Sequence, residues 1–61
     1  MRLSEILDFI PDDKIVCCTS TEGEALTYYD GRNSIEPEYM DYNVIRIEPV
    51  NNEMVEIIIE K

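Results

Sequence analysis

The chain has 61 residues, of which 44% are hydrophobic, and its 14 acidic and 5 basic residues give a formal net charge of −9 with no histidine. A chain this short buries only about 60% of its extended surface, so we expect a single domain over residues 1–61 and no deep catalytic cleft. The acidic balance argues against direct contact with nucleic acid or an anionic membrane, because both require clustered Lys and Arg. A basic protein surface is the natural electrostatic complement, and solubility is the plainer explanation of the same charge.

The N-terminal residues predict a short helix. Ser4 suits the N-cap, Glu5 lies in the first turn where the helix dipole favours a carboxylate, and Pro11 ends the helix. Four apolar residues at helical spacing form a face that must pack on a sheet: Leu3, Ile6, Leu7 and Ile10. We expect no signal peptide, because Glu5 and Asp8 interrupt this apolar stretch. No run approaches the ~20 apolar residues of a membrane span.

Residues 14–20 and 25–30 predict a first β-hairpin. A two-residue Glu-Gly turn would set Cys17 opposite Tyr28 and mix the two faces. A three-residue loop that ends at a left-handed Gly23 avoids this and is preferred. It pairs Cys18 with Leu26 and Val16 with Tyr28 on the core face, and it leaves Ile15 and Tyr29 on the other face.

The two adjacent thiols, Cys17 and Cys18, point to opposite faces of a strand. We therefore expect reduced cysteines in a cytoplasmic setting rather than a disulfide. Without histidine or a second ligand pair, the thiols predict no metal site and no cofactor. The paired carboxylates of the turns lack the spacing of a calcium loop. No residue is a candidate catalytic group, and we expect that the protein is not an enzyme.

The connection after the first hairpin contains a short helical turn. Glu36 is the expected cap, and Pro37 occupies the favoured first helical position. Ile35 and Met40 stand where a hydrophobic staple would place them. This connection therefore has apolar anchors of its own.

Residues 43–61 predict a second β-hairpin with the densest apolar content of the chain. A two-residue Asn-Asn turn would put Glu56 opposite Ile47 on the core face. A three-residue loop over residues 50–52, closed by a left-handed Asn52, avoids this. It pairs Ile45 with Ile57 and Ile47 with Val55 in the core beside Ile59, and it leaves an outer stripe of Val44, Arg46, Glu56 and Ile58.

The order of these elements predicts an α+β fold. A short N-terminal helix packs on a small antiparallel sheet of two β-hairpins, about four strands, with a short helical turn between the hairpins. Val44 and Ile58 have no reason to be apolar if the outer face is wet, so they are candidate contacts of a homodimer. The last strand could also pair with another chain if it lies at an edge of the sheet.

Three segments, MRLSEILDFIPDD, IEPEYMD and the ending NVIRIEP to VEIIIE, together resemble a type of very short acidic protein found in phages and other mobile elements of Gram-positive bacteria. In such proteins an N-terminal helix ends in Pro-Asp, and a central Ile-x-Pro-Glu turn precedes a closing hairpin. The resemblance spans most of the chain and assigns no catalytic or binding residue. It implies a mobile-element gene whose product acts in the cytoplasm of a bacterial host.

Residues 21–41 hold six acidic side chains against one basic side chain, and the four tyrosines fall in or beside this region. Tyrosines among carboxylates suit a protein interface, although some of these tyrosines could equally be core residues. The residues expected to contact a partner are Glu22, Glu24, Tyr29, Asp30, Glu36, Glu38, Tyr39, Asp41 and Tyr42.

These features favour a small binding protein that inhibits a larger, nucleic-acid-binding host defence protein by covering its basic surface, as anti-CRISPR proteins do. Two alternatives stay open. A homo-oligomer could sequester a small signalling nucleotide, with Lys14, Arg32 and Arg46 as phosphate contacts. The chain could also be a structural or assembly accessory of a mobile element.

Overall fold

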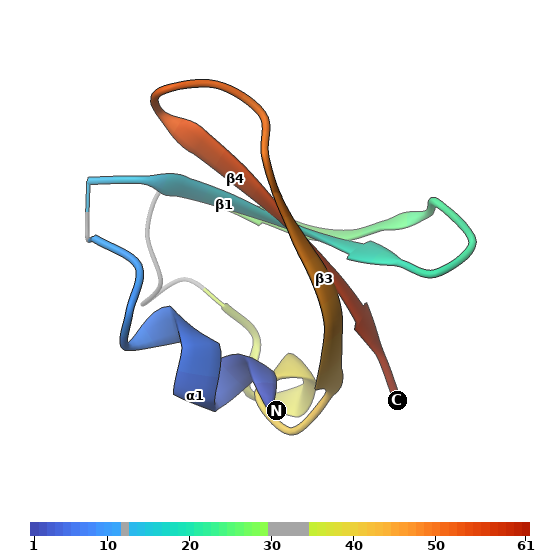
Figure 1. The fold of residues 1–61 in the computed structure, drawn as a ribbon. Helices are drawn as coiled ribbons and strands as arrows, with labels where there is room; N and C mark the ends of the chain where they lie inside the picture. Colours follow the sequence, from blue (N-terminus) through green and yellow to red (C-terminus); the bar gives the residue numbers. More distant parts are fainter. Residues whose placement is uncertain (12, 30–34) are drawn as a thin grey trace.

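The computed structural model describes residues 1–11, 13–29 and 35–61, with the backbone alone at residues 28 and 29. The elements in chain order are α1 (Leu3–Leu7), β1 (Ile15–Ser20), β2 (Ala25–Tyr29), the 3₁₀ helix η2 (Pro37–Tyr39), β3 (Asn43–Pro49) and β4 (Met54–Glu60) (Figure 1). The predicted α+β fold with a short N-terminal helix and four strands is confirmed. The predicted helical turn between the hairpins is confirmed as η2.

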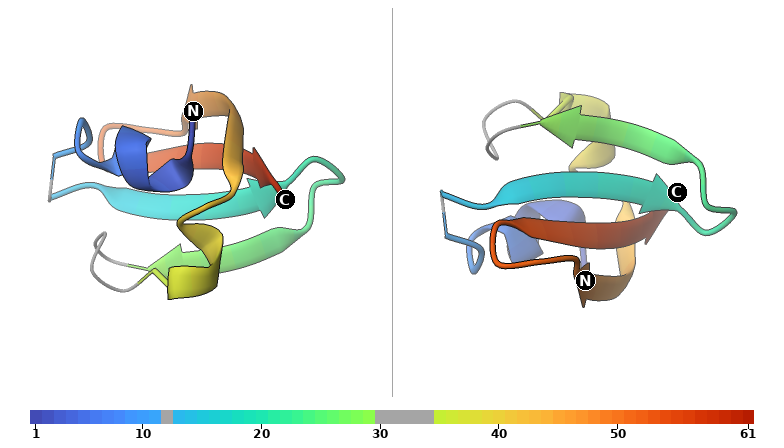
Figure 2. Two further views of the ribbon diagram at one scale, coloured as in Figure 1. Left: turned by 90° about the horizontal axis from the view of Figure 1, so that it is seen from below. Right: turned by 90° about the horizontal axis from the view of Figure 1, so that it is seen from above.

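The strands form one sheet in the order β2-β1-β4-β3, as both views of Figure 2 show. Each hairpin is antiparallel, but the two hairpins meet through β1 and β4, which run parallel. The sheet is therefore mixed rather than wholly antiparallel. The last strand, β4, is an inner strand, so the edge position that its pairing with another chain would require is not present. The edges are β2 and β3, and η2 lies in the connection that joins them.

The β1–β2 loop has the predicted form. Ser20 N–H donates a hydrogen bond to the carbonyl of Glu24 (2.8 Å), which closes a loop over residues 21–23. The last loop residue, Gly23, has φ of 88° and is left-handed. Only glycine adopts this conformation without a steric penalty, so the sequence signal for this loop is strong.

The register of β1 against β2 differs from the prediction, because a bulge between Cys18 and Thr19 moves β2 by one residue. The resulting pairs are Val16 with Tyr29, Cys17 with Tyr28, Cys18 with Thr27 and Thr19 with Ala25. Both pairs predicted for the core face are therefore wrong. Leu26 lies at the bulge and still packs against the core. The faces predicted for the side chains of residues 28 and 29 lie outside the described part.

The β3–β4 loop begins one residue later than predicted. Val50 N–H donates to the carbonyl of Met54 (3.0 Å), so the loop runs over residues 51–53. Asn51 shapes it, because Asn51 Oδ1 accepts hydrogen bonds from the N–H groups of Glu53 (2.8 Å) and Met54 (2.9 Å). The prediction of a left-handed Asn52 is wrong, since no described residue other than glycine has a positive φ.

The later loop shifts the register of the second hairpin by two residues, which is one full period of a strand. The pairs are Val44 with Ile59, Arg46 with Ile58, Ile47 with Ile57, Glu48 with Glu56 and Pro49 with Val55. The predicted pairs of Ile45 with Ile57 and of Ile47 with Val55 are therefore wrong. A bulge between Val44 and Arg46 then turns Val44 from the outer stripe to the inner face of the sheet.

The core lies between the inner face of the sheet and the two short helices beneath it (Figure 1). Its buried residues are Leu3, Leu7, Val16, Cys18, Ile35, Ile57 and Ile59. Ile45 and Ile47 were predicted in this core but are 50% and 40% exposed. With five residues, α1 is too short to cover the sheet out to the far end of β3. No helix among the described residues is long and apolar enough to cross a membrane.

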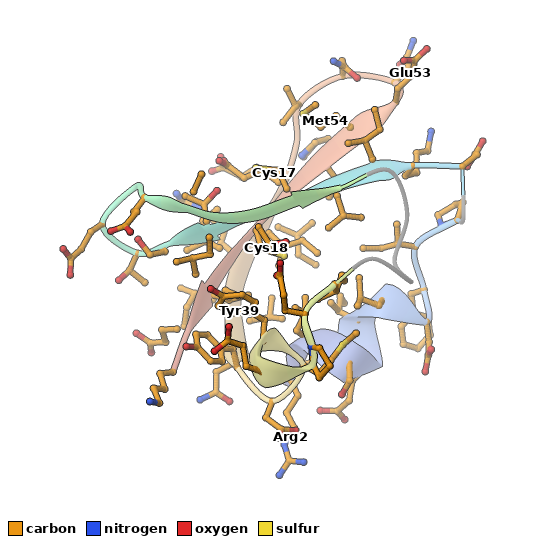
Figure 3. The ribbon with its side chains drawn as sticks, turned by 180° about the vertical axis from the view of Figure 1, so that it is seen from behind. Arg2, Cys17, Cys18, Tyr39, Glu53 and Met54 are labelled. Atoms are coloured by element: carbon orange, nitrogen blue, oxygen red, sulfur yellow. The ribbon has the colours of Figure 1, made fainter. Side chains whose placement is uncertain are left out.

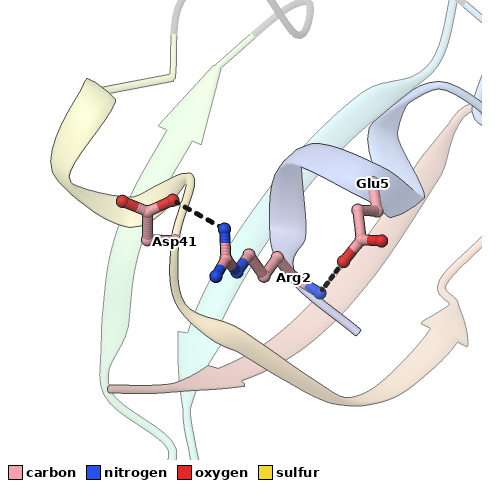
Figure 4. A network of polar contacts seen from close by, with 3 residues as sticks. All are labelled: Arg2, Glu5 and Asp41. Atoms are coloured by element: carbon pink, nitrogen blue, oxygen red, sulfur yellow. Dashed lines mark hydrogen bonds and ion pairs between the residues drawn. The ribbon is translucent and has the colours of Figure 1, made fainter.

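The N-terminus is anchored by backbone hydrogen bonds. The N-cap of α1 is Arg2 rather than the predicted Ser4, and Arg2 N–H donates to Glu5 Oε1 (2.8 Å; Figure 4). Ser4 N–H donates instead to the carbonyl of Met40 (3.1 Å), so it ties α1 to the end of η2. Val44 N–H donates to the carbonyl of Met1 (2.7 Å), which covers the first part of the β3 edge.

Candidate protein-binding surface

The β1–β2 loop holds one acidic residue of the predicted interface in place. Ser20 Oγ accepts hydrogen bonds from the N–H groups of Glu22 (3.2 Å) and Glu24 (3.1 Å). Together with the bond from Ser20 N–H to the Glu24 carbonyl, these contacts fix the backbone of Glu24 at the start of β2. The carboxylates of Glu22 and Glu24 belong to exposed residues.

The 3₁₀ helix η2 places the two tyrosines side by side. Pro37 occupies its first turn, and Tyr39 N–H donates to the carbonyl of Glu36 (3.1 Å). Tyr42 N–H donates in turn to the carbonyl of Tyr39 (3.1 Å). A spacing of three residues in this conformation stacks side chains on one side. The rings of Tyr39 and Tyr42 accordingly meet edge to face, with centroids 5.1 Å apart and planes at 74°.

The charges of several carboxylates act on Tyr39. Its pKa is raised from the ordinary value of 10.0, and partial burial is the largest cause. The other causes are, in decreasing order, the negative charges of Glu38, Tyr42, Glu36 and Glu24. Glu24 is far from η2 in sequence, so the fold has brought the first hairpin and η2 together here.

We call this set the Tyr39 surface; its members are Glu24, Glu36, Glu38, Tyr39 and Tyr42. Figure 3 shows Tyr39 beneath the sheet, on the side of the core helices. Both tyrosines pack partly against the core, so each buries part of its ring and leaves the remainder on the surface. Tyr39 and Tyr42 are therefore partly core residues and partly available for an interface.

The other predicted contact residues stand apart from this surface. Asp41 points to the N-terminus, where its Oδ1 lies 3.9 Å from an Arg2 guanidinium nitrogen (Figure 4). Glu22 is exposed in the hairpin loop, and its carboxylate is not among the charges that act on Tyr39. The side chain of Tyr29 and all of Asp30 lie outside the described residues.

The two residues predicted as homodimer contacts lie on different faces of the sheet. Val44 faces inward and packs against the core. Ile58 does lie on the outer face, but only 8% of it is exposed, and its inner strand β4 has β1 on one side and β3 on the other. Neither residue offers the exposed apolar surface that the prediction required.

Sequence reasoning missed the apolar residues that are exposed at the other edge. Ile45, Ile47 and Val50 are all at least 40% exposed along β3 and its turn. The alternation of β3 favoured a half-buried strand, and it gave no reason to leave Ile45 and Ile47 outside the core. One signal was available. Pro49 within a strand indicates an edge position, since proline has no N–H to donate to a neighbouring strand.

The two cysteines occupy opposite faces of β1, as predicted (Figure 3). Cys18 is buried in the core and Cys17 is half-buried on the outer face. Thr19 Oγ1 donates to Glu56 Oε2 (3.0 Å), and Cys17 Sγ lies 3.9 Å from Thr19 Oγ1. This polar cluster satisfies Glu56, which the register places opposite another carboxylate, Glu48.

The residues proposed for phosphate contact are already engaged. Lys14 Nζ donates to the carbonyl of Asn52, and Arg46 Nε lies 2.9 Å from Glu48 Oε1. Arg32 lies outside the described residues. Within residues 1–11, 13–29 and 35–61 there is no pocket and no group of acidic or thiol ligands that could hold a metal ion.

Comparison of the chain with models of protein families found no match. Comparisons with curated proteins and with solved structures likewise returned no significant match.

Proposed function

We propose that the protein is a small binding module that covers a basic surface on a larger protein and thereby displaces nucleic acid from it. The observation that supports this proposal is the Tyr39 surface, where the charges of three carboxylates, from the first hairpin and from the η2 region, act on one of two packed tyrosines. In this proposal the module acts by contact and not by catalysis, inside a bacterial host, as the product of a mobile element directed at a defence protein.

The chemistry of the Tyr39 surface suits a basic partner. Carboxylates attract clustered Lys and Arg, and they raise the rate of encounter with such a surface. Tyrosines contribute ring area, a hydroxyl group and a face on which an arginine can stack. Because both rings are packed against each other and the core, they lose little freedom when a partner binds.

Three acidic residues elsewhere in the described chain already have partners within the chain. Asp41 is paired with Arg2, Glu48 with Arg46, and Glu56 accepts from Thr19. The charges of Glu24, Glu36 and Glu38 instead converge on a neutral tyrosine whose pKa they raise. The negative potential of these three carboxylates is therefore present at the Tyr39 surface, where a partner would dock.

The test uses the immobilised chain to capture proteins from a Gram-positive host lysate, followed by elution with duplex DNA or RNA. We expect a captured protein that nucleic acid releases, and we expect added salt to weaken its binding. The triple variant Glu24→Gln, Glu36→Gln, Glu38→Gln should weaken capture by about tenfold or more.

The matched control is the triple variant Asp13→Asn, Glu53→Gln, Glu60→Gln, which removes the same three charges from exposed residues outside the Tyr39 surface. We expect it to retain most of the binding. Equal losses for the two variants would mean that only net charge matters. Capture that survives excess nucleic acid and the first triple variant would contradict the proposal.

A further inference from the structure

Exposed apolar side chains gather along the outer edge of β3. Ile45 is 50% exposed, Ile47 is 40% exposed, and Val50 in the following turn is 55% exposed. β3 forms the edge of the sheet opposite β2 (Figure 2). β3 has some of the usual protections of an edge strand, in its charged residues and in Pro49, but it is seven residues long and still exposes Ile45 and Ile47.

The backbone of this edge is available for pairing over its second half. Val50 N–H faces β4, since it donates to Met54, and successive residues of a strand direct their backbone groups to opposite sides. Ile47 therefore presents both its N–H and its carbonyl outward. Pro49 presents a carbonyl outward and has no N–H. The N-terminal residues cover the first part of the same edge, where Met1 accepts from Val44 N–H and Arg2 forms a β-bridge with Asn43.

We propose that β3 pairs with β3 of a second copy of this chain, antiparallel, about a two-fold axis at Ile47. In this register the two Ile47 residues face each other and exchange two hydrogen bonds. Ile45 lies opposite Pro49, which has no N–H, so this pair forms fewer hydrogen bonds than the Ile47 pair. The exposed apolar side chains of the two copies then cover one another.

The charges on β3 identify a second copy as the occupant. Arg46 and Glu48 flank Ile47 on the outer face and form an ion pair within one chain, with Nε and Oε1 2.9 Å apart. Pairing about Ile47 places Arg46 of each copy opposite Glu48 of the other, which adds two cross-strand pairs of opposite charge. The edge is therefore complementary in charge to itself.

The same charges exclude the neighbouring registers. A slip by one residue puts apolar side chains of one copy on the polar face of the other. A slip by two residues in one direction sets Arg46 against Arg46, and in the other direction it sets Glu48 against Glu48. Only the register centred on Ile47 satisfies the side chains on both faces.

This dimer uses none of the residues of the Tyr39 surface, so it can be true or false independently of the proposed function. It also responds to salt in the opposite way. Each copy carries a formal net charge of −9, and screening of that mutual repulsion should strengthen the dimer as salt is added. Binding to a basic partner should weaken under the same conditions.

The test is sedimentation velocity of the full chain over a series of concentrations. We expect a reversible dimer for the wild type. Arg46→Glu and Glu48→Arg should each weaken dimerisation at least about tenfold, because each puts like charges opposite each other twice. The double variant Arg46→Glu, Glu48→Arg restores opposite charges and should recover the wild-type constant to within about threefold. Lys61→Glu and Glu53→Arg are controls that change the net charge equally at exposed sites outside β3.

A second variant tests the backbone contacts. Ile47→Pro removes an outward N–H without affecting the bonds to β4, so the circular dichroism spectrum should stay that of the folded chain while the dimer is lost. A wild-type chain that remains monomeric throughout the series would overturn the proposal. A double charge variant that stays as weak as the single variants, although folded, would overturn it as well.

Discussion

The loops of the two hairpins are built in nearly the same way, but only the first loop could be placed from the sequence. Each loop spans three residues, and in each a polar side chain accepts two backbone N–H groups: Ser20 Oγ in the first hairpin and Asn51 Oδ1 in the second. The first loop also ends in a left-handed glycine, and the second contains no left-handed residue. A glycine at a required position identifies a loop from sequence, whereas two adjacent asparagines leave its position open.

The strands beyond the loops diverge further. β1 and β4 meet at the centre of the sheet, so one strand of each hairpin is covered on both sides by pairing. Of the two edges, β2 lies near η2 and brings Glu24 to Tyr39, while β3 leaves Ile45 and Ile47 exposed. The comparison shows that strand position in the sheet, rather than hydrophobicity, determines which isoleucines are buried.

The largest expected effect is the difference in stability between substitutions at two paired isoleucines, one buried and one exposed. Ile57 and Ile47 face each other in the register, but Ile57 is fully buried and Ile47 is 40% exposed. Ile57→Ala should lower the free energy of unfolding by about 2–5 kcal/mol, because it leaves a cavity in the core. Ile47→Ala should cost less than about 1 kcal/mol. Urea denaturation at low protein concentration measures both, and equal losses would show that the β3 edge is not exposed.

The loop glycine should give the next largest effect. Gly23→Ala forces a side chain into a left-handed conformation with φ of 88°, which costs about 1–2 kcal/mol. Among the described residues, no atom beyond the two chain neighbours lies within 4 Å of the added methyl group, so the cost comes from the local backbone and not from a contact elsewhere in the fold. Asn52→Gly in the other loop is the control. It should not stabilise the chain, whereas a gain in melting temperature would indicate a left-handed Asn52 after all.

The polar side chains that hold the loops should have similar, smaller effects. Ser20→Ala and Asn51→Ala each remove an acceptor of two backbone hydrogen bonds, and each should lower the free energy of unfolding by about 0.5–1.5 kcal/mol. Asn52→Ala should stay within about 0.5 kcal/mol of the wild type. A larger loss for Asn52→Ala than for Asn51→Ala in chemical denaturation would contradict the observed loop.

The smallest effect concerns the pH dependence of Tyr39. Its pKa is higher in the folded chain than in the unfolded chain, so the folded state retains the proton longer. Its contribution to stability is therefore complete below pH 10 and is lost as the pH rises through the folded pKa. Glu38→Gln should lower the pKa of Tyr39 towards its ordinary value, as followed by ultraviolet titration of the tyrosinates. Tyr39→Phe identifies the signal, and Glu53→Gln, far from this ring in the other loop, should leave it unchanged.

The sequence was informative where a residue type strongly favours one backbone conformation or one position in an element. Gly23 placed the first loop, Pro37 placed the start of η2, and the helical spacing of Leu3 and Leu7 placed the helix face in the core. Parts of the candidate site followed from the density of acid and tyrosine between residues 21 and 42. The convergence of Glu24 on Tyr39 did not, because no local pattern joins a hairpin loop to a helical turn.

The sequence by itself therefore determined the elements, the fold class and the acidic, tyrosine-bearing character of the middle region, since these depend on local conformation and composition. The structure decided the registers, through a bulge in the first hairpin and through a later loop and a bulge in the second, and it decided the parallel contact of β1 with β4. It also decided which apolar residues are covered: Ile58 is buried on the outer face, and Ile47 is exposed at the edge. The physical reason is that the burial of a strand residue depends on which strands lie on either side of it, and strands distant in sequence supply those neighbours.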